Sequence, residues 1–103
     1  MTPTGPDRGR RTVAIVWYRE ADWPRLRTLF ADRDELPDTY AEWLATAEAL
    51  LASLKRNGIN GAKVRLDPET FSAWCAAQSL APDAQARSRY VGEVAAARHR
   101  PRH

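Results

Sequence analysis

Residues 36–58 read LPDTYAEWLATAEALLASLKRNG and predict a long helix with one apolar face. Large apolar and small side chains recur at three- and four-residue spacing, which places them on one side of a helix. They are Tyr40, Trp43, Leu44, Ala47, Leu51 and Leu54. We expect the core of the domain to form around this face.

Both ends of the predicted helix carry recognisable signals. Thr39 and Glu42 have the spacing of a capping box, in which each side chain accepts a hydrogen bond from the backbone amide of the other residue. Lys55 and Arg56 suit the negative end of the helix dipole. Gly58 can adopt the left-handed conformation that commonly ends a helix.

Two strand-like segments flank this helix. Residues 12–18 (TVAIVWY) are apolar on both faces, which is typical of a strand that is covered on two sides. Residues 62–66 (AKVRL) alternate apolar and basic side chains, so this strand has one solvated face and is predicted to lie at an edge of the sheet. Asn60-Gly61, just before it, is read as a turn.

Three further helices are predicted. The first begins near Asp22 as N-cap and runs to about Ala31. The second is capped by Asp67, with Pro68 at its first position. The third runs from about Asp83 to Arg98.

The resulting order is β-α-α-β-α-α, so we predict a small single α/β domain over residues 12–98. A helical crossover between the two strands would make them parallel. Because two parallel strands alone are a poor sheet, we expect a homodimer in which a second copy extends or covers the sheet. Residues 1–11 and 99–103 are predicted to be disordered basic tails.

The positive charge of the chain is concentrated in these tails. Residues 1–12 and 98–103 hold six arginines against one aspartate, whereas residues 13–97 hold ten cations against twelve carboxylates. A tail contact with nucleic acid would use these arginines. They are Arg8, Arg10, Arg11, Arg98, Arg100 and Arg102.

Catalytic and metal-binding patterns are weak. Cys75, the single cysteine, lies on an apolar helix face without a nearby base, so we interpret it as a buried hydrophobic residue rather than a nucleophile. His99 and His103 are separated by the helix breaker Pro101. The acidic segment 32–38 lacks the glycine and glutamate of a calcium loop. We expect no cofactor, no membrane span and a cytoplasmic location.

One corner of the sequence combines aromatic and charged side chains after the first strand. Trp17, Tyr18, Arg19, Asp22 and Trp23 could stack a base or a sugar, or could be core aromatics between strand and helix. Open α/β folds bind ligands at this end of a strand. No glycine-rich phosphate loop follows, which disfavours a nucleotide.

Three motifs resemble a family of small uncharacterised bacterial proteins. They read WYRxxDWPxLR in residues 17–27, LPDTYxEW in residues 36–43 and FxxWC in residues 71–75. The resemblance covers roughly residues 12–97. It implies no activity and no catalytic residues.

The sequence therefore favours a non-catalytic protein-interaction module of a bacterial cell or mobile element. Two alternatives stay open. One is a nucleic-acid-associated accessory protein that uses the arginine tails. The other is a small ligand binder or enzyme at the Tyr18-Arg19-Asp22-Trp23 corner.

Overall fold

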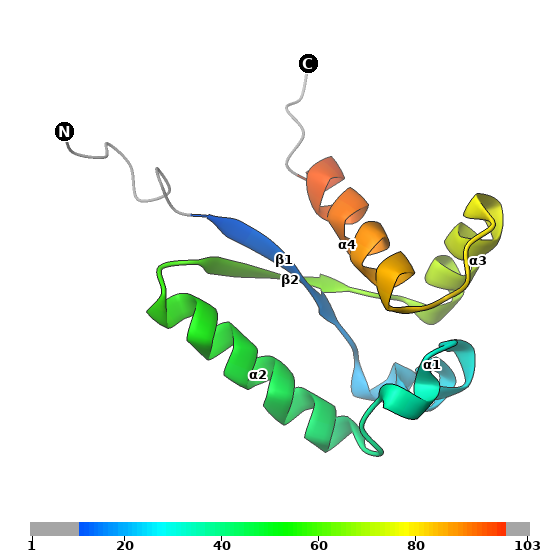
Figure 1. Cartoon of the computed structure of the whole chain (residues 1–103), viewed down its shortest axis with the longest axis horizontal. Coiled ribbons are helices and arrows are strands. Elements are labelled where there is room, and N and C mark those ends of the chain that lie inside the picture. Colours follow the sequence, from blue (N-terminus) through cyan, green and yellow to red (C-terminus); the bar gives the residue numbers. More distant parts are fainter. Residues whose placement is uncertain (1–10, 99–103) are drawn as a thin grey trace.

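The computed structural model describes residues 11–98, in which two parallel strands lie between helices (Figure 1). The strands are β1 (Thr12–Trp17) and β2 (Asn60–Arg65). The helices are α1 (Trp23–Leu29), α2 (Tyr40–Arg56), α3 (Pro68–Gln78) and α4 (Ala84–Arg98), with short 3-10 segments η1 (Glu20–Asp22) and η2 (Arg33–Glu35). This order confirms the predicted small α/β domain. The tails predicted over residues 1–11 and 99–103 lie outside the described part, except for Arg11.

Helix α2 begins and ends as its sequence predicts. The Glu42 amide donates to the Thr39 hydroxyl at 3.1 Å, and the Thr39 amide donates to the Glu42 carboxylate at 3.3 Å. The capping box thus satisfies two amides that the helix itself cannot. Gly58 has a φ of +74°, a conformation that glycine adopts without a Cβ clash. Its amide donates to the Lys55 carbonyl at 3.0 Å and closes the last turn.

The two strands pair in parallel, because α2 carries the chain back to the end of the sheet where β1 began. Thr12 lies opposite Asn60, and Trp17 lies opposite Arg65. The prediction of a parallel pair is confirmed. This register fixes which backbone groups of each strand face its neighbour and which face outward.

The predicted turn at Asn60-Gly61 is wrong, since both residues belong to β2. The turn lies three residues earlier, at Asn57-Gly58. Gly61 has a packing reason instead. A Cβ there would lie 2.7 Å from Cδ2 of Leu51, so the missing side chain allows α2 to approach β2 closely.

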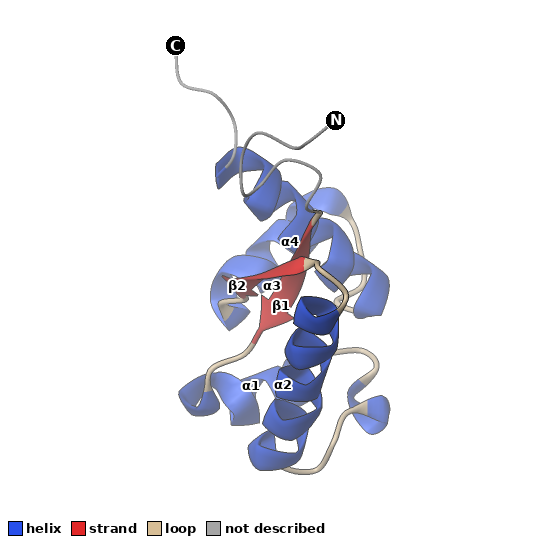
Figure 2. Ribbon diagram, turned by 90° about the vertical axis from the view of Figure 1, so that its left-hand side faces the viewer, coloured by secondary structure: helices blue, strands red, loops and turns tan. Residues whose placement is uncertain are grey.

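The sheet is the middle of three layers. Helix α2 covers one face and α4 the other, as both views show (Figures 1 and 2). Helices α1 and α3 follow the carboxyl ends of β1 and β2. The main buried cluster joins the strands to α1, α3 and α4, and consists of Tyr18, Trp23, Leu26, Phe30, Val64, Leu66, Phe71, Cys75, Ala86, Tyr90 and Val91.

The segment between β1 and α2 differs from the prediction in two details. Asp22 occupies the N-cap position of α1 but makes no capping hydrogen bond with its side chain. The helix ends at Leu29, because Phe30 takes an extended backbone and its side chain is fully buried. The loop that follows contains η2.

Candidate functional site

Six aromatic residues gather where β1 leads into α1, and we call them the aromatic cluster: Trp17, Tyr18, Trp23, Phe30, Tyr40 and Trp43. The ring of Tyr18 lies 4.8 Å from that of Trp43, 5.7 Å from that of Phe30 and 5.9 Å from that of Trp23. Tyr18 and Trp23 are only 2 % and 6 % exposed. Edge and tilted contacts of this kind stabilise a core beyond the area that they bury.

The polar residues of the predicted corner separate from this cluster. Asp22 accepts a hydrogen bond from Arg65 at 2.9 Å, while Arg19 is exposed to solvent. Nε1 of Trp23 is buried and has no acceptor among the described residues. The structure therefore brings Tyr18 and Trp23 into the core, leaves Trp17 half-buried and leaves Arg19 outside. A ligand site at this corner stays a prediction.

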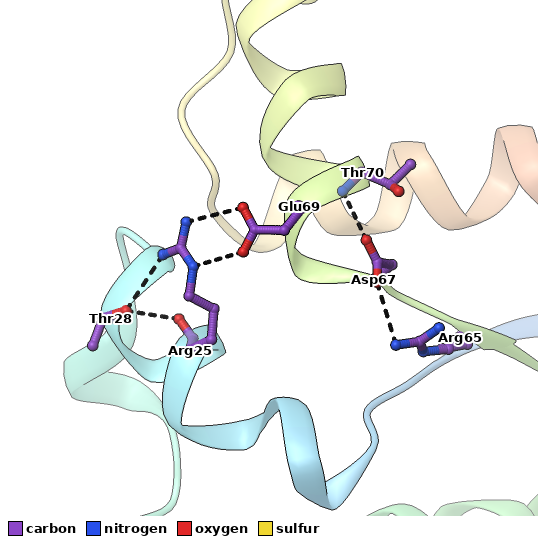
Figure 3. A network of polar contacts seen from close by, with 6 residues as sticks. All are labelled: Arg25, Thr28, Arg65, Asp67, Glu69 and Thr70. Carbon is purple, nitrogen blue, oxygen red and sulfur yellow. Dashed lines mark hydrogen bonds and ion pairs between the residues drawn. The ribbon is translucent and has the colours of Figure 1, made fainter.

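Ion pairs join the helices at the carboxyl ends of the strands (Figure 3). Arg25 of α1 donates twice to Glu69 of α3, at 2.8 and 3.3 Å. Asp67 caps α3 by accepting from the Thr70 amide at 2.9 Å, as predicted, and also pairs with Arg65 at 3.3 Å. These side chains are largely exposed, so the contacts orient α1 and α3 but add little stability.

A buried ion pair joins α4 to the loop after α1 and was not predicted from the sequence. Arg87 of α4 donates to both carboxylate oxygens of Asp32, at 2.7 and 2.8 Å, and its guanidinium stacks 4.2 Å from the centre of the Phe30 ring. These hydrogen bonds hold the pKa of Asp32 below its ordinary value, against the opposing effect of burial. Burial also raises the pKa of Tyr18 to about 12, with neighbouring Arg87 acting the other way.

The sequence contains an indication of this ion pair in the spacing of residues on α4. Arg87 stands three and four residues before Tyr90 and Val91, and this spacing puts a cation on the buried face of α4. A buried arginine needs a carboxylate partner. Asp32 was considered only as part of the acidic segment 32–38, yet its side chain is only 16 % exposed.

The free edge of β1 carries backbone amides and carbonyls that have no hydrogen-bond partner among the described residues. The amides of Asn60 and Leu66 donate to the carbonyls of Arg11 and Trp17, at 2.8 and 3.0 Å. Backbone groups alternate in direction along a parallel strand. In β1 the odd-numbered residues, such as Trp17, bond to β2. The amides and carbonyls of the even-numbered residues Ala14 and Val16 therefore point away from β2. Nothing in residues 11–98 bonds to them outside the ladder.

A groove of about 380 Å³ runs along this edge. We call it the edge groove, and its lining is Ala14, Ile15, Val16 and Tyr18 of the β1 segment, Leu50 of α2, and Ala84, Arg87, Ser88, Val91 and Gly92 of α4. Since α2 and α4 cover opposite faces and β2 contributes no lining, the groove follows the free side of β1. Leu50 is 45 % exposed and is the exposed large hydrophobic residue of the described chain.

The free edge of β2 is different in chemistry. Its outward positions include Lys63 and Arg65, and the Arg98 guanidinium donates to the Lys63 carbonyl at 3.4 Å. The Lys63 ammonium lies 4.3 Å from the centre of the Trp17 ring. Charged side chains on an outer strand discourage pairing with another chain.

The candidates for catalysis and metal binding find no support in residues 11–98. Cys75 is buried, and burial raises the pKa of its thiol, with Asp83 acting in the same direction. No group of three His, Cys, Asp or Glu side chains in that range is arranged to hold a metal ion. His99 and His103 lie outside it. No helix in the described residues is both long and apolar enough to cross a membrane.

The predicted nucleic-acid contacts are described only in part. Arg11 and Arg98 are exposed and stand at the amino end of β1 and the carboxyl end of α4. The other four arginines of that set, Arg8, Arg10, Arg100 and Arg102, lie outside the described residues.

One family model matches the chain. Its description is Domain of unknown function (DUF8829), and it matches residues 7–102, which include both the folded domain and the six terminal arginines. Neither the curated proteins nor the solved structures compared with the chain gave a match.

Proposed function

The chain belongs to this family of unknown function, and on that premise we propose that it is a non-catalytic protein-interaction module that works through the edge groove. The partner is a second copy of the chain, whose β1 pairs with β1 to make one continuous four-stranded sheet. The observation that carries the proposal is the outward-facing, unbonded backbone of Ala14 and Val16 beside the exposed Leu50. A bacterial cell or mobile element and a cytoplasmic location remain part of this proposal.

The backbone of β1 supplies the affinity in such a complex. An added strand takes up the free amides and carbonyls of an edge in main-chain hydrogen bonds, and side-chain pockets beside the edge select the partner. Two strands alone are below the usual size of a stable sheet. Pairing with another strand would also place β1, which is apolar on both faces, at the centre of a sheet instead of at its border.

A second copy fits the groove better than an unrelated segment for reasons of symmetry and size. A two-fold axis beside β1 brings the two edges together antiparallel, so the same outward groups serve as donor and acceptor on both sides. The axis also brings Leu50 and Val16 of each chain towards the partner's groove. A chain of this length has a small core and gains buried area by self-association.

The oligomeric mass tests this proposal at Leu50. At micromolar concentration, light scattering should give the mass of two chains for the native protein and of one chain for Leu50→Lys. Leu50 is exposed, so the variant should keep a cooperative melt. The matched control is Ala52→Lys, which adds the same charge at an exposed position of α2 that does not line the groove.

Two results would count against the proposal. A native protein that stays monomeric at high concentration would show that the helices cover β1 without a partner. A dimer that survives Leu50→Lys but is lost in Ala52→Lys would place the interface on another face of α2.

A further inference from the structure

We propose that the end of the domain where the strands begin binds the phosphate backbone of nucleic acid. We call this end the basic pole, and its described cations are Arg11, Lys55, Arg56 and Arg98. This surface is separate from the edge groove, and no lining residue of that groove belongs to it. The inference therefore goes beyond the proposed self-association.

Strand β1 begins at the basic pole, and α2 and α4 end there. The Asn60 amide donates to the Arg11 carbonyl at 2.8 Å, which holds the start of β1 beside the start of β2. The turn after α2 leads directly into β2, so Lys55 and Arg56 lie at the same end. The Arg98 side chain reaches the edge of β2 by donating to the Lys63 carbonyl at 3.4 Å.

Nine of the twelve cations in residues 11–98 fall into two groups, and the other three, Arg19, Arg33 and Lys63, also make no ion pair with a described carboxylate. Five arginines pair with carboxylates, and all five belong to the rest of the domain: Arg25, Arg27, Arg65, Arg87 and Arg89. The four cations of the basic pole are exposed and make no ion pair with a described carboxylate. Lys55, Arg56 and Arg98 lie in sequence segments without a carboxylate, since residues 49–66 and 94–98 contain no aspartate or glutamate.

The chain that continues from the basic pole carries the same charge. Residues 8–10, which precede Arg11, and residues 99–103, which follow Arg98, contain four more arginines and no acidic residue. Both terminal segments thus continue directly from cations of the basic pole, Arg11 and Arg98, which make no ion pair with a described carboxylate. Eight cations in three short runs of the sequence suit a polymer with regularly repeated charge, and arginine can bind a phosphate through two parallel hydrogen bonds.

Nucleic acid fits this surface better than a lipid membrane. Helices that bind a membrane surface insert an apolar face beside their cations. The exposed large hydrophobic residue of the described chain, Leu50, lines the edge groove instead. The basic pole offers charge without an apolar anchor, which is the pattern of sequence-independent backbone binding.

Fluorescence anisotropy with a labelled DNA duplex of arbitrary sequence, titrated with the full chain at several salt concentrations, tests the inference. Non-specific binding should fall steeply with salt. Lys55→Gln combined with Arg56→Gln should reduce the slope of log K against log salt by about 2, if each side chain neutralises one phosphate. Arg98→Gln should reduce it by about 1.

A matched double variant makes the result specific to the basic pole. Arg33→Gln with Arg89→Gln removes the same net charge from exposed positions elsewhere and should leave the slope unchanged. An equal loss in both double variants would overturn the inference, because net charge alone would then account for binding. Absence of duplex binding at low salt would also overturn it, as would binding to anionic vesicles without binding to the duplex.

Discussion

The two edges of this small sheet both carry unpaired backbone groups, but the side chains around these groups differ in kind. On the outer side of β2 the free backbone groups belong to Lys63 and Arg65, and the Arg98 side chain donates to the Lys63 carbonyl. The outer side of β1 presents the unbonded backbone of Ala14 and Val16 in an apolar groove. One edge is protected by charge, and the other is open to an added strand.

The difference shows where a sheet of two strands can grow. Both strands have outward-facing amides and carbonyls, so backbone chemistry alone does not distinguish the edges. The side chains that surround them do. A partner at β2 would have to desolvate or displace cations, whereas a partner at β1 would cover the exposed Leu50.

The largest effect should come from breaking the contact between the two strands. By alternation from the Leu66 amide, the Val64 amide points towards β1, and its side chain is fully buried. Val64→Pro removes an inner donor and misfits the core, so we expect a loss of at least about 3 kcal/mol in the free energy of unfolding. Urea melts would measure this loss.

The neighbouring position gives the control for that experiment. The Lys63 amide points away from β1, and its side chain is exposed. Lys63→Pro should therefore cost only about 1 kcal/mol, the usual span of strand propensities. Equal losses in Val64→Pro and Lys63→Pro would contradict the register on which the comparison of edges depends.

A second, smaller effect concerns the support of the edge groove. Asp32→Asn leaves Arg87 buried with a neutral partner, and removing one member of a buried pair costs about 3 kcal/mol. The exposed pair offers the contrast, since Glu69→Gln should cost less than about 1 kcal/mol. If both substitutions cost the same, the Arg87 side of the groove is not held by a buried pair.

The stabilisation by Asp32 should depend on pH in a defined direction. Arg87 holds the pKa of Asp32 below its unfolded value, so the unfolded chain binds the proton more readily. The contribution is then fully present above the ordinary carboxyl pKa of about 4 and is lost as the pH falls through the folded value. The difference between native protein and Asp32→Asn should be constant near neutrality and should shrink below about pH 4. A difference that grows in acid would contradict this sign.

Sequence reasoning succeeded where the signals are local and failed where they depend on topology. The capping box at Thr39 and Glu42 needs only neighbouring residues, and it was predicted correctly. The turn at Asn60-Gly61 was wrong, because the close approach of Leu51, which explains Gly61, is visible only once α2 packs on β2.

The candidate sites were harder still to predict. The edge groove follows from the strand register, which no composition or spacing reveals. Lys55 and Arg56 were correctly read as suited to a helix end, but their position at the end of the domain where β1 begins depends on the topology of the sheet. The aromatic corner drew attention because tryptophan and tyrosine are common in binding sites, and the same residues are equally useful in a core.

A small effect on stability should accompany the sharpest effect on assembly. The Ala14 amide faces the edge groove, so Ala14→Pro removes an outward donor without removing a bond to β2, a position at which proline is tolerated. We expect a cost of about 1 kcal/mol in the folding of the chain. Light scattering should nevertheless give the mass of one chain. Lys63→Pro, which removes an outward donor on the charged edge, should leave the mass of two chains unchanged. If Ala14→Pro remains a dimer while Lys63→Pro becomes a monomer, the charged edge of β2 is the one that pairs, and the assignment of the two edges must be exchanged.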